Sequence, residues 1–202
     1  MAYASWVTPN KTQGSGNDTV SWSGSAHTGR NARQTTATFS ASGVESKVLT
    51  IIQAGKTEFV SMDDTATVAK GGGTVTISGT SNSSKLTFSL TGTDQIGLTL
   101  PSSYTANSVS TTNGAAITGD PGATQQYAFS ITFANVGANT GVSARTAQLT
   151  VTDNGGHTDT CTITQAAGDA TLSISPTTIN LTAAGVADNS VTVTSNTSWT
   201  IS

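Results

Sequence analysis

The sequence predicts an all-β protein built from antiparallel sandwiches in tandem. The first observation is that short runs such as "TTATFSA", "GTVTISG" and "YAFSITF" alternate apolar residues with Ser, Thr or Ala along the whole chain. This period of two is typical of half-buried strands. The second is that turn sequences rich in Gly, Asn, Asp and Pro separate these runs, while no window has a capped helical period. The third is an internal repeat.

The repeat is clearest towards the end of each unit. Residues from Ala26 align without a gap with residues from Ala138 as far as a shared glutamine. Arg33 then matches Arg145, and Gln53 matches Gln165. These stretches predict the last two strands of one structural unit, present twice in the chain.

A second match gives the unit boundaries. Residues from Glu58 resemble those from Thr171, and both stretches predict the early strands of a unit. We therefore expect three segments. Residues 1–56 hold only later strands, residues 57–168 form a complete unit with a long inserted loop, and residues 169–202 hold only early strands.

The composition narrows the possible functions. Only 9% of the residues are charged, against roughly 25% in ordinary soluble proteins. Hydrophobic residues make up 35%, which can still fill the thin core of a sandwich because only alternate residues face inward. The net charge of −3, without a basic stripe, argues against nucleic acid as a partner.

Several motifs resemble the BACON family, immunoglobulin-like modules of surface proteins in gut bacteria and of their phages. The motifs are "SVTVTSNTSWTIS" with Trp199, "ASWVTPNKTQGSG" with Trp6, and the two closing stretches described above. The middle unit departs from the pattern because it lacks Trp. The resemblance implies tandem immunoglobulin-like (BACON-type) antiparallel β-sandwiches, one complete and two complementary partial units, but no particular ligand.

The two partial segments complement each other. Half a sandwich exposes apolar faces and strand edges, so each partial unit should seek the other. The linkers near residues 54–57 and 166–170 reach roughly 17 Å, whereas the middle unit should be roughly 33 Å long. We therefore expect a homo-oligomer formed by head-to-tail strand exchange. The expected assembly interface consists of Trp6, Val191, Val193, Trp199 and Ile201.

The chain offers little for catalysis. Its two histidines, His27 and His157, fall in predicted turns, and its single cysteine, Cys161, falls in a strand pattern. Catalysis needs a nucleophile, a base or a metal in convergent geometry. We expect no enzymatic activity, no catalytic or metal-ligating residues and no cofactor.

The inserted loop of the middle unit, near residues 101–125, is the expected surface contact, since long loops on sandwiches often carry function. Tyr104, Asn113 and Tyr127 are the candidate residues. An extra hairpin in this place is an equally acceptable interpretation.

Two functional hypotheses remain. The first is a structural phage virion protein, a capsid-decorating or head-fibre protein on the capsid exterior that contacts the major capsid protein or other virion proteins. The second is a secreted carbohydrate-binding module for host glycans. The N-terminus lacks a signal-peptide pattern and no apolar stretch approaches a membrane span. This favours the virion protein, made in the host cytoplasm. A third possibility is that further residues of a longer chain complete the last unit.

Overall fold

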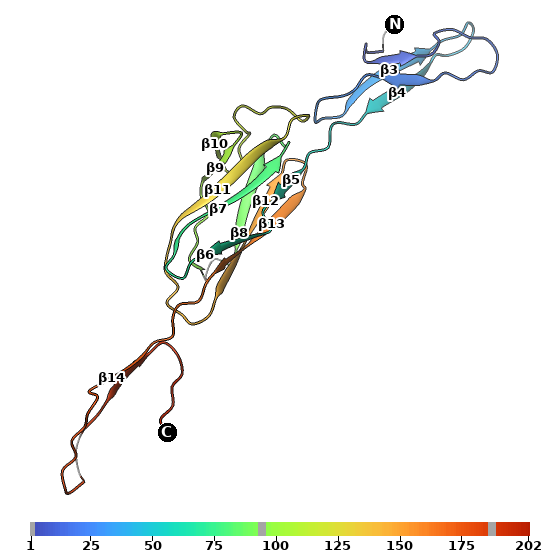
Figure 1. The fold of residues 1–202 in the computed structure, drawn as a ribbon. Coiled ribbons are helices and arrows are strands. Elements are labelled where there is room, and N and C mark those ends of the chain that lie inside the picture. Colours follow the sequence, from blue (N-terminus) through green and yellow to red (C-terminus); the bar gives the residue numbers. More distant parts are fainter. Residues whose placement is uncertain (1–2, 93–95, 186–188) are drawn as a thin grey trace.

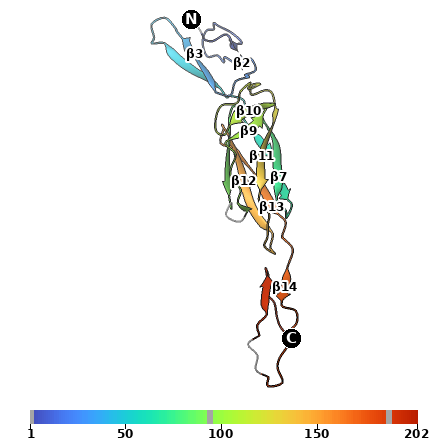
Figure 2. The same cartoon turned by 90° about the vertical axis from the view of Figure 1, so that its left-hand side faces the viewer.

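The computed structural model describes residues 3–92, 96–185 and 189–202. Three bodies follow one another in an elongated row, with the two termini in the bodies at opposite ends (Figures 1 and 2). The described residues form fifteen strands arranged in five sheets. The predicted all-β class is confirmed.

The central body is a sandwich of two sheets. The five-stranded sheet has the order β10-β9-β11-β7-β5, and the four-stranded sheet has the order β6-β13-β12-β8. The first sheet consists of β5 (Val60–Met62), β7 (Gly73–Ser81), β9 (Ser103–Ala106), β10 (Val109–Thr112) and β11 (Tyr127–Val136). The second consists of β6 (Thr65–Val68), β8 (Leu86–Thr91), β12 (Arg145–Asp153) and β13 (Thr158–Gln165). Neighbouring strands run antiparallel, except for β6 and β13, which are parallel.

The core of this sandwich follows from the period-two pattern. Ile77 and Ile131 of one sheet, and Leu149 and Ile163 of the other, are completely buried. The intervening Ser and Thr residues face outward, as alternation along a strand requires. The central body therefore buries a continuous apolar layer between its two sheets.

The two end bodies are small and open. At the N-terminal end, β1 (Val7–Pro9) pairs with β2 (Trp22–Gly24), and β3 (Arg33–Phe39) pairs with β4 (Lys47–Gln53). At the C-terminal end, β14 (Leu172–Ser175) pairs with β15 (Thr192–Ser195).

The first repeat recurs in three dimensions. Arg33 lies opposite Gln53 in β3–β4, and Arg145 lies opposite Gln165 in β12–β13. The side-chain amide of Gln53 donates to the Ser25 carbonyl at 3.0 Å, and the side-chain amide of Gln165 donates to the Gly137 carbonyl at 2.6 Å. The β3–β4 hairpin is therefore the geometric counterpart of β12–β13.

The second repeat, of the early strands, also recurs in three dimensions, and in each copy an asparagine side chain makes the same hydrogen bonds. The Asn82 side chain accepts from the Phe59 amide at 2.8 Å and donates to the Thr57 carbonyl at 3.0 Å. The Asn196 side chain accepts from the Thr171 amide at 2.8 Å and donates to the Asp169 carbonyl, again two residues before the amide. The β14–β15 hairpin is therefore the counterpart of β5 and the end of β7.

An arginine joins the N-terminal segment to the central sandwich. The Arg30 guanidinium donates to the Asp120 carboxylate at 2.6 and 2.9 Å and to the Asn82 carbonyl at 2.6 Å. It also lies 2.8 Å from the Glu58 carboxylate. The Arg30 and Asp120 side chains are only 17% and 26% exposed, so solvent screens this contact less than an ordinary surface pair.

The junction should weaken in acid. The hydrogen bond from Arg30 holds the pKa of Asp120 below its usual value. A depressed folded-state pKa gives stability that is complete above the unfolded value of about 3.9 and is lost as the pH falls through the folded value. We expect Asp120→Asn to weaken docking by about 1–3 kcal/mol at neutral pH. NMR relaxation should then show the N-terminal segment tumbling separately, while the control Asp18→Asn should not. Unchanged tumbling in Asp120→Asn would contradict this role for the ion pair.

Candidate binding groove

The inner face of the β3–β4 hairpin is incompletely covered. Phe39 is 45% exposed, whereas its counterpart in the repeat, Val151, is fully buried. Leu49 is 37% exposed, whereas its counterpart Cys161 is fully buried. At these two register positions, residues that would belong to the core of the central sandwich are partly open to solvent, although Ala37, the counterpart of Leu149, is buried. Within the described residues, the part of this face around Phe39 and Leu49 therefore lacks strands that cover its counterpart.

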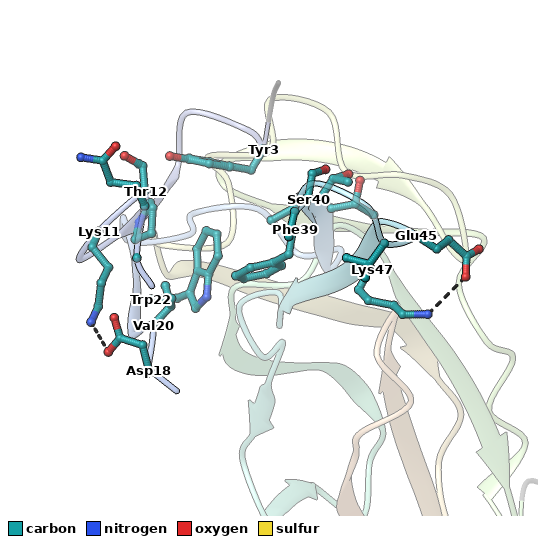
Figure 3. Close-up of a pocket in the computed structure, with 18 of the residues that line it drawn as sticks. Tyr3, Lys11, Thr12, Asp18, Val20, Trp22, Phe39, Ser40, Glu45 and Lys47 are labelled. Carbon is teal, nitrogen blue, oxygen red and sulfur yellow. Dashed lines mark hydrogen bonds and ion pairs between the residues drawn. The ribbon is translucent and has the colours of Figure 1, made fainter. Parts of the chain in front are cut away.

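A cavity of about 640 Å³ lies beside β3 and reaches the open face at Phe39. Most of its lining comes from β2, β3, the loop before β2 and the turn before β4. Tyr3, Trp22 and Phe39 are its aromatic residues, and Figure 3 shows the Trp22 and Phe39 rings close together. The Tyr3 and Trp22 rings meet edge to face with centroids 5.3 Å apart, an arrangement that aromatic pairs favour. The volume, and a lining that combines aromatic with polar side chains, suit a binding site.

Two ion pairs lie at opposite sides of this groove (Figure 3). Lys11 contacts Asp18 at 2.6 Å, and Lys47 contacts Glu45 at 3.3 Å. The hydrogen bond from Lys11 lowers the pKa of Asp18. Both pairs are solvent-exposed and contribute little to stability.

Trp6 belongs to the framework beside the groove. The Arg33 guanidinium lies 4.4 Å from the centroid of the half-buried Trp6 ring. Arg33 also donates to the Gln53 side chain at 2.9 Å and to the Ser25 carbonyl at 2.8 Å. Because Arg33 stacks on the ring and is held by two further acceptors, Trp6 is fixed in place.

The other predicted interface residues lie in the C-terminal body. Trp199 is 47% exposed and Ile201 86% exposed, while Val191 and Val193 are half-buried beside or within β15. The structure does not bring Trp6 and Trp199 together within one chain, since their segments lie at opposite ends (Figure 1).

The structure corrects the prediction that Tyr104 and Tyr127 form a surface contact in the inserted loop. Tyr104 and Tyr127 are buried, and burial raises the pKa of both phenols. The Tyr104 ring packs against Phe88 with centroids 4.9 Å apart, and the Tyr127 hydroxyl donates to the Ser83 carbonyl at 2.8 Å. Neither tyrosine is available as a surface contact. Both are core residues because they alternate with outward-facing neighbours in β9 and β11.

Asn113 has a structural role as well. Its side chain accepts from the Phe88 amide at 2.7 Å and donates to the Phe88 carbonyl at 3.0 Å. These bonds hold the turn after β10 against β8. The inserted stretch contains the β9–β10 hairpin, which was the alternative interpretation of this region.

Titratable residues are scattered. Within the described residues, no three His, Cys, Asp or Glu side chains are grouped to hold a metal ion. Burial raises the pKa of Cys161 to about 11. His27 contacts the Asn31 carbonyl at 2.7 Å and His157 contacts Asp153 at 2.8 Å, so each ring holds its own turn. No helix in the described part of the chain has the length and apolarity to cross a membrane.

The groove lies in the segment that comparison with known families identifies. Residues 1–54 match the BACON family model. Its description is "Putative binding domain, N-terminal". The predicted resemblance is confirmed for this segment, which contains every residue that lines the groove. The BACON match supports a binding module here. No curated protein matches the chain.

The sequence did not predict the three aromatic residues that line the groove, Tyr3, Trp22 and Phe39. Trp22 carried a signal, because it is a large aromatic residue that alternates with serine in a short predicted strand. Phe39 could have been found from the repeat, since its counterpart Val151 is an inward-facing strand residue. Tyr3 precedes the first strand and carried no periodic signal.

Proposed function

We propose that this protein is a binding module that assembles head to tail with further copies of itself. The groove of one copy accepts residues 169–202 of the next. One observation carries the proposal. Several positions that are buried in the central sandwich are exposed in both end bodies, and each end body has counterparts of strands that the other lacks.

The C-terminal segment has the properties of a donor. Leu172 and Ile174 of β14 are 63% and 49% exposed, although Met62, the counterpart of Ile174 in β5, is only 5% exposed. Burying a Leu or Ile side chain contributes about 1.5–3 kcal/mol. Several such residues, together with the ladder hydrogen bonds of an added strand, can offset the cost of association.

The geometry favours exchange between copies over closure within one chain. The β3–β4 and β14–β15 hairpins lie at opposite ends of the central sandwich in both views (Figures 1 and 2). An interface between unlike surfaces propagates as a fibre or closes into a ring. The protein is thus a polymer-forming module.

The proposed setting is the exterior of a phage virion, as a capsid-decorating or head-fibre protein docked on the major capsid protein or another virion protein. The resemblance to modules of gut-bacterial surfaces and phages supports this setting, as does the capacity for polymer formation. Carbohydrate binding is the second candidate, favoured by the aromatic residues Tyr3, Trp22 and Phe39 in the groove. The two activities compete for one surface, so a glycan would bind only unassembled copies.

The test is the mass of the full-length protein by sedimentation velocity across a concentration series. We expect mass to rise with concentration, and Phe39→Asp to abolish this rise because a carboxylate would be buried in the apolar interface. The control is Val109→Asp, which changes another exposed strand residue outside the groove. A monomer at every concentration would refute assembly. Glycan-array binding lost on Trp22→Ala would then support the second candidate.

A further inference from the structure

In the described residues, β4 has one edge without a partner strand, and this edge has a specific counterpart in the central sandwich. There, β13 pairs with β12 on one edge and with β6, in parallel, on the other. In the N-terminal segment, β4 pairs with β3 in a two-stranded sheet. Unpaired edges of this kind accept additional strands. The counterpart of β6 is therefore the natural occupant of this edge.

We propose that residues 178–181 of one copy add to β4 of the next copy as a parallel strand. This inference rests on the proposed head-to-tail assembly and specifies its register. It identifies the occupant as a segment outside the β14–β15 hairpin, so the donor contributes to both sheets of the completed unit.

A shared turn identifies residues 178–181 as the counterpart of β6. After β6, the Gly72 amide donates to the Ala69 carbonyl at 2.9 Å, and Gly72 has a φ of +81°. In the C-terminal segment, the Gly185 amide donates to the Thr182 carbonyl at 2.9 Å, and Gly185 has a φ of +73°. Both turns use the left-handed conformation that glycine tolerates best. Counting back from this glycine puts Leu181 at the position of Val68.

The exposure of this segment fits a missing partner. Val68 is 4% exposed in β6, whereas Leu181 is 66% exposed. Ile179, also apolar, is 39% exposed. These residues follow β14 and precede the turn at Gly185, outside any described strand. Pairing with β4 would give the segment a ladder and cover its apolar side chains.

The register follows from the pairs in the central sandwich. Thr162 lies opposite Thr65, and Gln165 lies opposite Val68. Transferred through the repeat, these pairs become Thr50 opposite Thr178 and Gln53 opposite Leu181. The first of the two intervening pairs is Ile51 opposite Ile179, whose counterparts are Ile163 and Ala66. The proposal thus fixes which residues of two copies become neighbours.

Disulfide trapping tests this register in the full-length protein. Thr50→Cys combined with Thr178→Cys should give a ladder of covalent oligomers on oxidation, because neighbouring strands are about 4.8 Å apart and a disulfide spans about 4.4–6.8 Å between Cα atoms. The matched control is Thr50→Cys with Asn180→Cys, which moves one thiol two residues along the same face. Their Cα atoms would be about 8 Å apart, beyond disulfide reach. The native thiol, Cys161, is buried and should not compete.

Each outcome is decisive when sedimentation of the reduced samples is measured alongside. A ladder at least tenfold stronger for the Thr178 pair than for the Asn180 pair is the expected result. Suppose that the reduced protein assembles, but that the Asn180 pair gives an equal or stronger ladder or that neither pair gives a ladder. This result would overturn the parallel register alone. Reduced wild-type protein that stays monomeric would overturn the head-to-tail assembly and, with it, the register.

Discussion

Replacing Ile163 with alanine is expected to destabilise the central sandwich by about 2–5 kcal/mol. Ile163 is fully buried in β13, between the two sheets, and its removal leaves a cavity that neighbouring strands cannot easily fill. The same substitution at Ile51, its counterpart in β4, should leave the unfolding of the central sandwich unchanged. Ile51 belongs to a separate, half-open body, so its loss should instead weaken assembly.

The measurement uses two probes that report on different bodies. The three tryptophans, Trp6, Trp22 and Trp199, all lie outside the central sandwich, so their fluorescence follows the end segments. Amide hydrogen exchange of β12 and β13 follows the central sandwich. Equal losses of protection in the central strands for Ile51→Ala and Ile163→Ala would show that the bodies fold as one cooperative unit, contrary to this expectation.

Much of the fold could be predicted from the sequence because its signals are local. Alternation identifies β11 and β12, and the repeat predicted that Arg33–Gln53 and Arg145–Gln165 occupy equivalent places. Those pairs have the same register in the structure. The periodicity of a strand is set by its own residues, so it can be detected without knowledge of its neighbours.

The groove and the inserted stretch were harder to predict because they depend on what covers a strand. The position of Tyr104 and Tyr127 beside a long insertion predicts that they lie on the surface, yet both face the core. Phe39 has an inward-facing position but is only partly covered. Sequence alternation predicts the face on which a residue lies, whereas burial depends on whether a second sheet is present. The immunoglobulin-like topology and the segment boundaries remain predictions.

A single chain of residues 169–202 followed directly by residues 2–56 should fold as one compact, monomeric domain. The first part supplies the counterparts of β5, β6 and β7, and the second supplies the β3–β4 hairpin and the groove. Joining them makes the proposed contact intramolecular, so it no longer depends on concentration. The donor residues Leu172, Ile174 and Leu181 would then be buried.

The joined chain should unfold in one cooperative urea transition with a midpoint independent of protein concentration, and sediment as a monomer. The matched control contains the same two parts with Ile174→Asp, which places a carboxylate where the counterpart Met62 is buried. An unpaired buried charge costs several kcal/mol, so this variant should lose the transition. Cooperative folding of residues 2–56 alone, with the same stability, would contradict the proposal, because the groove would then need no donor strand.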